Sequence, residues 1–218
     1  MSDTRTAIVQ VIESCGVMGI IRMKDPSGLP AVVEALAEGG VRALEITMTV
    51  PGAVELIRQT ARTLPAGFVM GAGTVCDEET VRRVVDAGAR FIVSPVMRPA
   101  VIKAAHAAGV PAFPGCFSPT EILEAWDLGA EIIKVFPATA LGPGYLKDVH
   151  GPLPQVKLMP TGGVTIDNAG DWIRAGACGV GVGSALLAPK AIAAGDYAAL
   201  TDGAKRIMAN VDAARKGR

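Results

Sequence analysis

The chain has 218 residues, of which 50% are hydrophobic and 26 are glycine, while aromatic residues make up only 4%. Its 21 Lys and Arg residues balance 21 Asp and Glu residues, so the formal net charge is zero. Because nucleic acids and anionic membranes attract a basic excess, this balance argues against both as partners, and the length fits one domain over residues 1–218.

The first predicted element is an amphipathic helix over residues 3–15, because one helical stripe carries Ile8, Val11, Ile12 and Cys15. After it, one unit recurs: a glycine, a short apolar strand, a loop and a helix that ends at the next glycine. Glycine suits a helix end because it adopts the left-handed conformation without a Cβ penalty. The glycines that mark the units are Gly16, Gly40, Gly67, Gly88, Gly109, Gly129, Gly151 and Gly176. The sequence therefore predicts eight βα units.

The predicted strands are residues 17–21, 43–47, 68–71, 90–93, 111–113, 131–135, 155–159 and 178–182. Nearly continuous apolar strands that alternate with helices are typical of a parallel sheet covered on its outer face. Eight evenly spaced units favour a closed (β/α)₈ TIM barrel with an extra N-terminal helix, and an open doubly wound sheet is the structural alternative. A last helix is predicted over residues 196–215.

Two of the predicted helices have capping signals at their start. Asp25 precedes Pro26, and Ser118 precedes Pro119 with Glu121 at the capping-box position. We therefore expect helices to begin at these two prolines.

Lys134 is an unusual residue for the predicted strand 131–135. It shares a strand face with Ile132 and Phe136, so a charge is expected between large apolar neighbours. An apolar site disfavours the ammonium form, and a neutral amine is a nucleophile. The alternative is a structural lysine that reaches solvent or pairs with a carboxylate.

Glu45 is a second charge inside a predicted strand, on the same face as Ala43 and Thr47. If Glu45 and Lys134 both point inward, they share one cavity. An amine that loses its proton beside a carboxylate that takes it is the pair that amine catalysis needs, and a structural ion pair is the alternative.

The carboxyl ends of the strands are where a barrel places its active site, so Arg22 and the segment 71–74 are also candidates. A guanidinium after the first strand suits capture of a carboxylate or phosphate, and a salt bridge with Glu45 is the alternative. In segment 71–74, two glycines allow a ligand to approach the backbone, and the Thr74 hydroxyl is a donor.

Glycine-rich loops follow the seventh and eighth predicted strands, at residues 160–164 and 179–184. Free backbone N–H groups in such loops hold phosphate, and barrels commonly use these two loops for it. The glycine spacing does not match a dinucleotide-binding fingerprint. The sequence therefore predicts a phosphate site.

Metal, membrane and export signals are not expected. The two histidines and four cysteines lack metal-ligand spacing, and prolines and glycines interrupt the longest uncharged stretch, residues 104–120. The polar start does not lead into an apolar signal segment. We expect a cytoplasmic protein with reduced cysteines and no metal.

Seven short motifs together resemble one enzyme family, and the resemblance runs from about residue 8 to residue 190. The motifs are Leu44-Glu45-Ile46-Thr47, Gly71-Ala72-Gly73-Thr74, Ile92-Val93-Ser94-Pro95, Pro114-Gly115, Ile133-Lys134-Val135-Phe136-Pro137, Pro160-Thr161-Gly162-Gly163 and Val182-Gly183-Ser184. They resemble the 2-keto-3-deoxy-6-phosphogluconate (KDPG) and 4-hydroxy-2-oxoglutarate (KHG) aldolases.

The resemblance implies a class I aldolase that cleaves KDPG to pyruvate and glyceraldehyde 3-phosphate, and also KHG to pyruvate and glyoxylate. It implies a homotrimer without metal or organic cofactor, whose partners are the phosphorylated keto acid and pyruvate. The stereochemistry at C4 stays open, so 2-keto-3-deoxy-6-phosphogalactonate (KDPGal) is an alternative substrate. A sugar-phosphate isomerase or epimerase on the same barrel, or a catalytically silent sugar-phosphate binding protein, is the alternative function.

The resemblance also implies roles for residues. Lys134 would form a Schiff base with the C2 ketone, and Glu45 would shuttle protons. The implied substrate-binding residues are Arg22, Thr74, Pro95, Phe136, Thr161, Gly162, Gly163, Gly183 and Ser184. Thr49 stands where many members carry a carboxylate-binding arginine, and our hypothesis is that Arg22 replaces it.

Overall fold

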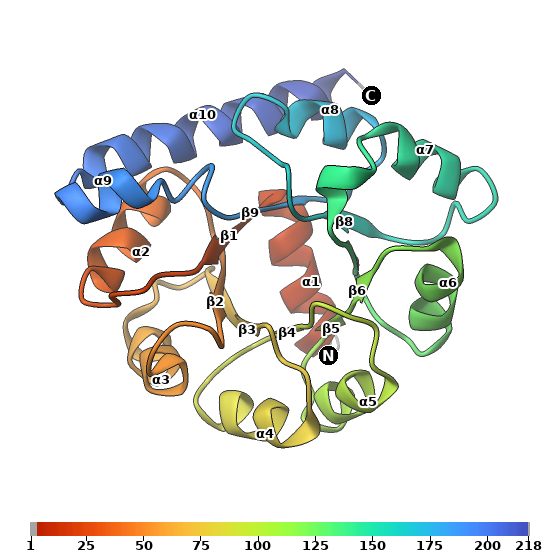
Figure 1. Ribbon diagram of the computed structural model, residues 1–218, viewed down its shortest axis with the longest axis horizontal. Helices are drawn as coiled ribbons and strands as arrows, with labels where there is room; N and C mark the ends of the chain where they lie inside the picture. Colours follow the sequence, from red (N-terminus) through yellow and green to blue (C-terminus); the bar gives the residue numbers. More distant parts are fainter. Residues whose placement is uncertain (1–3, 218) are drawn as a thin grey trace.

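The computed structural model describes residues 4–217, which form strands inside a ring of helices (Figure 1). The strands are β1 (Val17–Ile21), β2 (Ala43–Thr47), β3 (Val69–Gly73), β4 (Ile92–Val93), β5 (Ala112–Phe113), β6 (Gly115–Cys116), β7 (Ile133–Val135), β8 (Leu158–Pro160) and β9 (Val180–Val182). The helices are α1 (Thr4–Cys15), α2 (Leu29–Glu38), α3 (Ala53–Thr63), α4 (Glu78–Asp86), α5 (Pro99–Ala107), α6 (Pro119–Asp127), α7 (Gly144–His150), α8 (Ala169–Arg174), α9 (Pro189–Ala194) and α10 (Tyr197–Lys216), with a 3₁₀ turn η1 (Ala138–Ala140).

The strands form two parallel sheets, in the orders β5-β4-β3-β2-β1-β9 and β6-β7-β8. The last strand, β9, pairs with the first, β1, so the larger sheet curls round. A parallel bridge between Thr161 and Gly181 links the end of β8 to β9. The molecule is therefore an α/β unit with a curled parallel sheet.

The predicted fifth strand, residues 111–113, is wrong in extent. The structure has two short strands there, β5 and β6, with Pro114 between them. Proline has no N–H group and so cannot donate to a strand ladder, which explains the break. The Pro114 carbonyl still accepts from the Lys134 N–H at 3.0 Å, so the chain at the break stays beside β7.

One of the two predicted capping signals starts a helix and the other does not. Ser118 and Glu121 form a complete capping box, and α6 begins at Pro119 as predicted. Asp25 instead accepts from the Ser27 N–H at 2.9 Å in a turn, and α2 begins only at Leu29. The predicted start of that helix is therefore three residues early.

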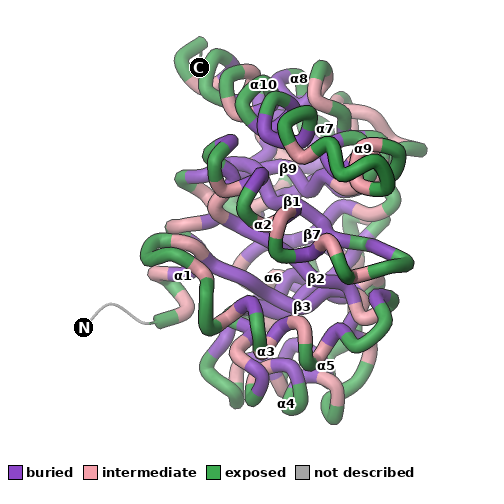
Figure 2. The backbone as a smooth tube through the Cα atoms, turned by 90° about the vertical axis from the view of Figure 1, so that its left-hand side faces the viewer, coloured by how far each residue is buried: buried purple, intermediate pink, exposed green. Residues whose placement is uncertain are grey.

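Alternating residues of the strands build two apolar cores, one inside the curled sheet and one between the sheet and the helices. The inner core consists of Ile8, Val9, Ile12, Met18, Ile20, Ala43, Val69, Phe91, Val93, Phe113, Ile132 and Met159. Leu44, Ile46, Ile133 and Val135 belong to the outer core. Figure 2 shows the buried strands between more exposed helices. Because successive strand residues point to opposite faces, membership of the inner core marks the inward face of each strand.

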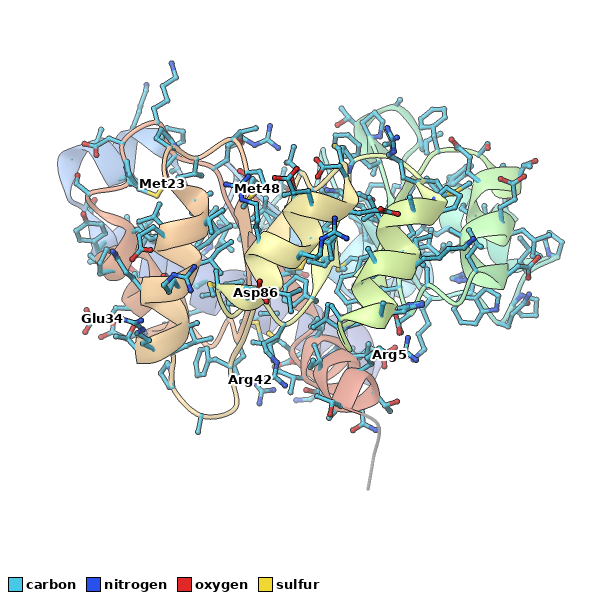
Figure 3. The ribbon with its side chains drawn as sticks, turned by 90° about the horizontal axis from the view of Figure 1, so that it is seen from below. Arg5, Met23, Glu34, Arg42, Met48 and Asp86 are labelled. Carbon is cyan, nitrogen blue, oxygen red and sulfur yellow. The ribbon has the colours of Figure 1, made fainter. Side chains whose placement is uncertain are left out.

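Helix α1 supplies Ile8, Val9 and Ile12 to the inner core, and it lies across the centre of the ring in Figure 1. Figure 3 places Arg5 of this helix and Arg42, which precedes β2, at one edge of the molecule. Met23 and Met48, which follow β1 and β2, lie at the opposite edge. The helix therefore covers the amino ends of the strands and leaves the carboxyl ends as the open mouth.

Within residues 4–217, the chain forms no helix with the length and hydropathy that crossing a membrane requires. The same residues contain no cluster of His, Cys, Asp or Glu side chains suited to hold a metal ion. His106 contacts Glu131 at 3.3 Å and His150 contacts the Val156 carbonyl at 3.0 Å, so both have partners within the fold.

Candidate active site

Lys134 and Glu45 are both buried, with 5% and 1% of their surface exposed. Lys134 lies two residues after Ile132 on β7, and Glu45 lies two residues after Ala43 on β2. Ile132 and Ala43 belong to the inner core, so both charged side chains also point inward. The structure therefore brings the predicted amine and carboxylate into one interior.

The pKa of the Glu45 carboxyl depends on its burial and on two nearby cations, Lys134 and Arg22. Burial raises the pKa of the Glu45 carboxyl, and the positive charges of Lys134 and Arg22 oppose that rise. The ion pairs found among residues 4–217 do not join Glu45 to either cation. The two salt-bridge alternatives for Glu45 are thus not observed.

Two buried polar atoms at the inward face have no hydrogen-bond partner among the described residues: Oε2 of Glu45 and Oγ1 of Thr161. Thr161 follows Met159 by two residues, so it shares the inward face of β8. Leaving a buried polar group unpaired costs about 1–3 kcal/mol, and native proteins rarely do so without a reason. A polar ligand between these two atoms would satisfy both.

Gly73, at the end of β3, gives the Glu45 carboxylate its space. A Cβ atom on Gly73 would collide with the Glu45 carboxylate oxygen, and a Cβ on Gly71 would collide with the Phe91 ring. The next residue, Thr74, has a φ of 61°, a left-handed conformation that is strained for a β-branched residue. The backbone of this strand end is thus fitted to the carboxylate.

We expect Gly73→Ala to lower kcat about 100-fold for any reaction that uses Glu45, because the added methyl group displaces the Glu45 carboxylate by about 1 Å. Gly144→Ala is the matched control, since a Cβ on Gly144 meets no atom within 4 Å. Steady-state kinetics and thermal melts of both variants test this. Equal activities of the two variants would contradict it.

Phe136 and Arg22 lie further toward the mouth. The Lys134 Nζ atom is 4.9 Å from the centroid of the half-buried Phe136 ring. Arg22 is exposed after β1 and lines a cleft of about 960 Å³ together with Lys24, Thr49 and Pro51. Neither Lys134 nor Glu45 lines this cleft, and the positive charge of Arg22 opposes the rise in the pKa of Glu45.

The glycine loops after β8 and β9 lie side by side, because a parallel bridge joins Thr161, directly after β8, to Gly181 within β9. Gly162 and Gly163 have φ angles of 91° and 73°, which only glycine adopts without strain. Among residues 4–217, no hydrogen bond engages the backbone N–H groups of Gly162, Gly163 or Ser184. These donors are free for an anion.

The predicted site residues fall into two groups. Lys134, Glu45 and Thr161 are buried on the inward face. The others lie at the carboxyl ends of strands and form the mouth: Arg22, Thr74, Pro95, Phe136, Gly162, Gly163, Gly183 and Ser184. The backbone carbonyl of Pro95 packs against Gly115, where a Cβ atom would collide with it.

The prediction missed Asn168, whose amide holds the Gly163 carbonyl at 2.9 Å. The signal available in the sequence is an asparagine at a helix N-cap three residues after Thr165, directly behind the glycine loop.

The sequence model of the family described as KDPG and KHG aldolase matches residues 8–202. The chain belongs to this aldolase family. Its members are carbon–carbon lyases, and the structure gives this aldolase a buried lysine beside a buried glutamate.

Relatives of this aldolase carry two different substrate names. The KHG/KDPG aldolase of Escherichia coli (strain K12) is 34% identical over 202 residues, which cover 92% of this chain and 94% of the relative. The 2-dehydro-3-deoxy-6-phosphogalactonate aldolase of the same organism is 35% identical over 170 residues, covering 78% and 83%.

A solved structure of a KDPG aldolase is also similar. The Legionella pneumophila enzyme, with pyruvate captured as a covalent carbinolamine intermediate, superposes with a TM-score of 0.85 and 31% identity. The match covers 91% of this chain and 97% of that one.

Proposed function

We propose that this aldolase uses Lys134 as a Schiff-base nucleophile to cleave KDPG into pyruvate and glyceraldehyde 3-phosphate, and also KHG into pyruvate and glyoxylate. The observation that carries the proposal is a lysine with 5% exposure on the inward face of β7, in the same interior as a buried carboxyl. The carbinolamine in the similar Legionella enzyme supports it.

In the proposed reaction the Lys134 amine adds to the C2 ketone and forms a carbinolamine, and Glu45 protonates the departing hydroxyl to give an iminium ion and water. The iminium then accepts the electron pair of the C3–C4 bond while Glu45 takes the proton of the C4 hydroxyl. The aldehyde leaves, the remaining enamine is protonated at C3, and water releases pyruvate from Lys134. Burial raises the pKa of Glu45 above that of an ordinary carboxyl, which makes the group easier to protonate and so suits a group that both gives and takes a proton.

The mouth residues would hold the two ends of the substrate. Thr74 and Thr161 would bind the pyruvate carboxylate, and Thr161 supports this with an unpaired hydroxyl. The free N–H groups of Gly162, Gly163 and Ser184 would bind the phosphate, with Gly183 allowing the loop to approach it.

KDPGal is the second candidate substrate, because one of the two Escherichia coli relatives is named for it. Steady-state kinetics with the two C4 epimers and with KHG decide among the three. We expect the highest kcat/KM with KDPG.

We further propose that the two sheets make one eight-stranded barrel, in which β5 and β6 are two parts of one strand. The pairing of β9 with β1, the bridge between β8 and β9, and the bond from Lys134 to Pro114 support closure.

A homotrimer in the cytoplasm completes the proposal. Val96, Phe117 and Leu123 are large apolar residues with 49%, 44% and 37% exposure, and an interface between subunits would cover them. All four cysteines are unpaired, which supports a reducing compartment. Sedimentation equilibrium should give three times the mass of the 22.3 kDa chain.

The direct test is trapping with pyruvate and borohydride. We expect a reduced pyruvyl group on the peptide that contains Lys134, and cleavage activity that survives a chelator. An unmodified lysine would contradict the proposal.

The Arg22 hypothesis gives a separate prediction. Arg22→Ala should raise KM for KDPG and for pyruvate about 10- to 100-fold, because a charge-assisted hydrogen bond to the carboxylate is lost. Lys24→Ala is the matched control, a neighbouring cation that lines the same cleft, and its KM values should stay close to wild type. Unchanged KM values in Arg22→Ala would refute the hypothesis.

A further inference from the structure

The segment 162–164, which we call the glycine loop, is held by two hydrogen bonds, one to the carbonyl of Thr161 just before it and one to the carbonyl of Gly163 within it. It lies between β8 and α8, at the mouth of the interior. Its three backbone N–H groups make no hydrogen bond with any described residue. Two of the three N–H groups belong to glycines, the most flexible residues, so other contacts must hold these donors in a fixed arrangement.

The first clamp comes from η1. The Ala138 N–H donates to the Thr161 carbonyl at 2.9 Å, which fixes the plane of the peptide between residues 161 and 162. In a trans peptide the C=O and N–H groups point in opposite directions, so this bond also aims the Gly162 N–H away from η1. Thr139 packs against the loop: a Cβ on Gly163 would lie 2.9 Å from its Cα.

The second clamp is the Asn168 side chain. Its Nδ2 donates to the Gly163 carbonyl at 2.9 Å and so fixes the plane of the peptide between residues 163 and 164. This bond aims the Val164 N–H away from α8. The amide cannot turn over, because its Oδ1 accepts from the Thr165 N–H at 2.8 Å. The Asn168 N–H in turn donates to the Thr165 Oγ1 at 3.1 Å, which completes a reciprocal cap.

We propose that Asn168 is a positioning residue that pre-organises the glycine loop for the phosphate group and thereby favours phosphorylated substrates over unphosphorylated ones. The inference rests on the proposed function. Without the clamp, binding of phosphate would have to order two left-handed glycines, and that ordering would weaken affinity. A substrate without phosphate does not use the loop and is not affected.

The test compares KDPG with KHG in two variants, Asn168→Ala and Asn168→Ser. The Asn168 side chain makes no capping bond to α8, so neither variant removes a helix cap, and serine is too short to replace the amide. Both variants should raise KM for KDPG about fivefold to tenfold, the effect of one lost hydrogen bond, and leave KM for KHG within about twofold. The inhibition constant of inorganic phosphate against KHG cleavage should rise by the same factor as KM for KDPG.

Thr165→Val is the matched control. It removes the hydroxyl that accepts from the Asn168 N–H and leaves both bonds of the Asn168 amide in place. Its KM for KDPG should stay within about twofold of wild type.

A change in KM that is equal for KDPG and KHG, or no change for either, would overturn the inference, because a merely structural role does not separate the two substrates. Failure of the proposed function looks different: the wild-type chain would then cleave neither substrate, and pyruvate with borohydride would leave Lys134 unmodified.

Discussion

Lys134→Ala should lower kcat/KM for aldol cleavage by at least about four orders of magnitude, because the covalent route is lost. Among residues 4–217, Lys134 is the only buried lysine, so no second amine in that part of the chain replaces it. Its neighbours Ile133 and Val135 belong to the outer core and would hold the strand in place in the variant. The variant should therefore fold and bind substrate without cleaving it.

Lys157→Ala is the matched control for this prediction. Lys157 precedes β8, has a side chain with 42% exposure and pairs with Glu13 at 2.9 Å, so it lies in a different environment. Its activity should stay near wild type, and borohydride should still trap pyruvate on Lys134. A Lys134→Ala enzyme that keeps its activity would instead indicate a sugar-phosphate isomerase or epimerase, whose chemistry needs no imine.

Much of the architecture could be predicted because local signals and the final fold agree. Strands β1 and β2 have the predicted bounds, since each is a short, mostly apolar run that follows a glycine turn. A period of two along each strand correctly placed Lys134 on one face with Ile132 and Glu45 on one face with Ala43, but it left open whether these faces point inward. Strand ends in the second half depend on pairing partners, and sequence does not reveal these: residues 155–157 are irregular and β8 begins only at Leu158.

The parts of the site that could not be predicted are those formed by contacts between distant segments. The Glu45 carboxylate of β2 occupies the space that a Cβ on Gly73 of β3 would need, and this contact joins two separate strands. The first clamp of the glycine loop joins backbone atoms of Ala138 and Thr161, and a backbone bond leaves no mark on residue type. The residues proposed to react could thus be selected from the sequence, whereas the contacts that hold them are visible only in the structure.

Glu45→Gln should lower the activity, and it should also remove a loss of stability that the wild type shows as pH rises. As proton shuttle, Glu45 contributes about 10²- to 10⁴-fold to the rate, so kcat should fall by that factor. The amide has nearly the same size as the carboxyl, so the pocket beside Gly73 should keep its shape. Steady-state kinetics across pH should also show that the acid limb of the profile due to this carboxyl is lost.

Burial raises the pKa of Glu45 above its ordinary value of 4.5. As pH rises from 4.5 through the native pKa, the folded state holds a proton that the unfolded state has already released, so stability falls over this window. Glutamine has no proton to release, and the variant should escape that loss. The Tm difference, variant minus wild type, should therefore grow as the pH rises above 4.5, until Glu45 has lost its proton in the folded wild type.

Glu124→Gln provides the reference, because Glu124 is exposed on α6 and its substitution should leave the pH dependence of Tm unchanged. Parallel Tm curves for wild type and Glu45→Gln would mean that the buried carboxyl does not hold its proton in the fold. Glu45 would then lack the ability to give and take a proton, and the proton shuttle would have to be another group. If the Tm difference grows with pH and kcat is also lost, then the buried Glu45 carboxyl both lowers stability as pH rises and takes part in the reaction.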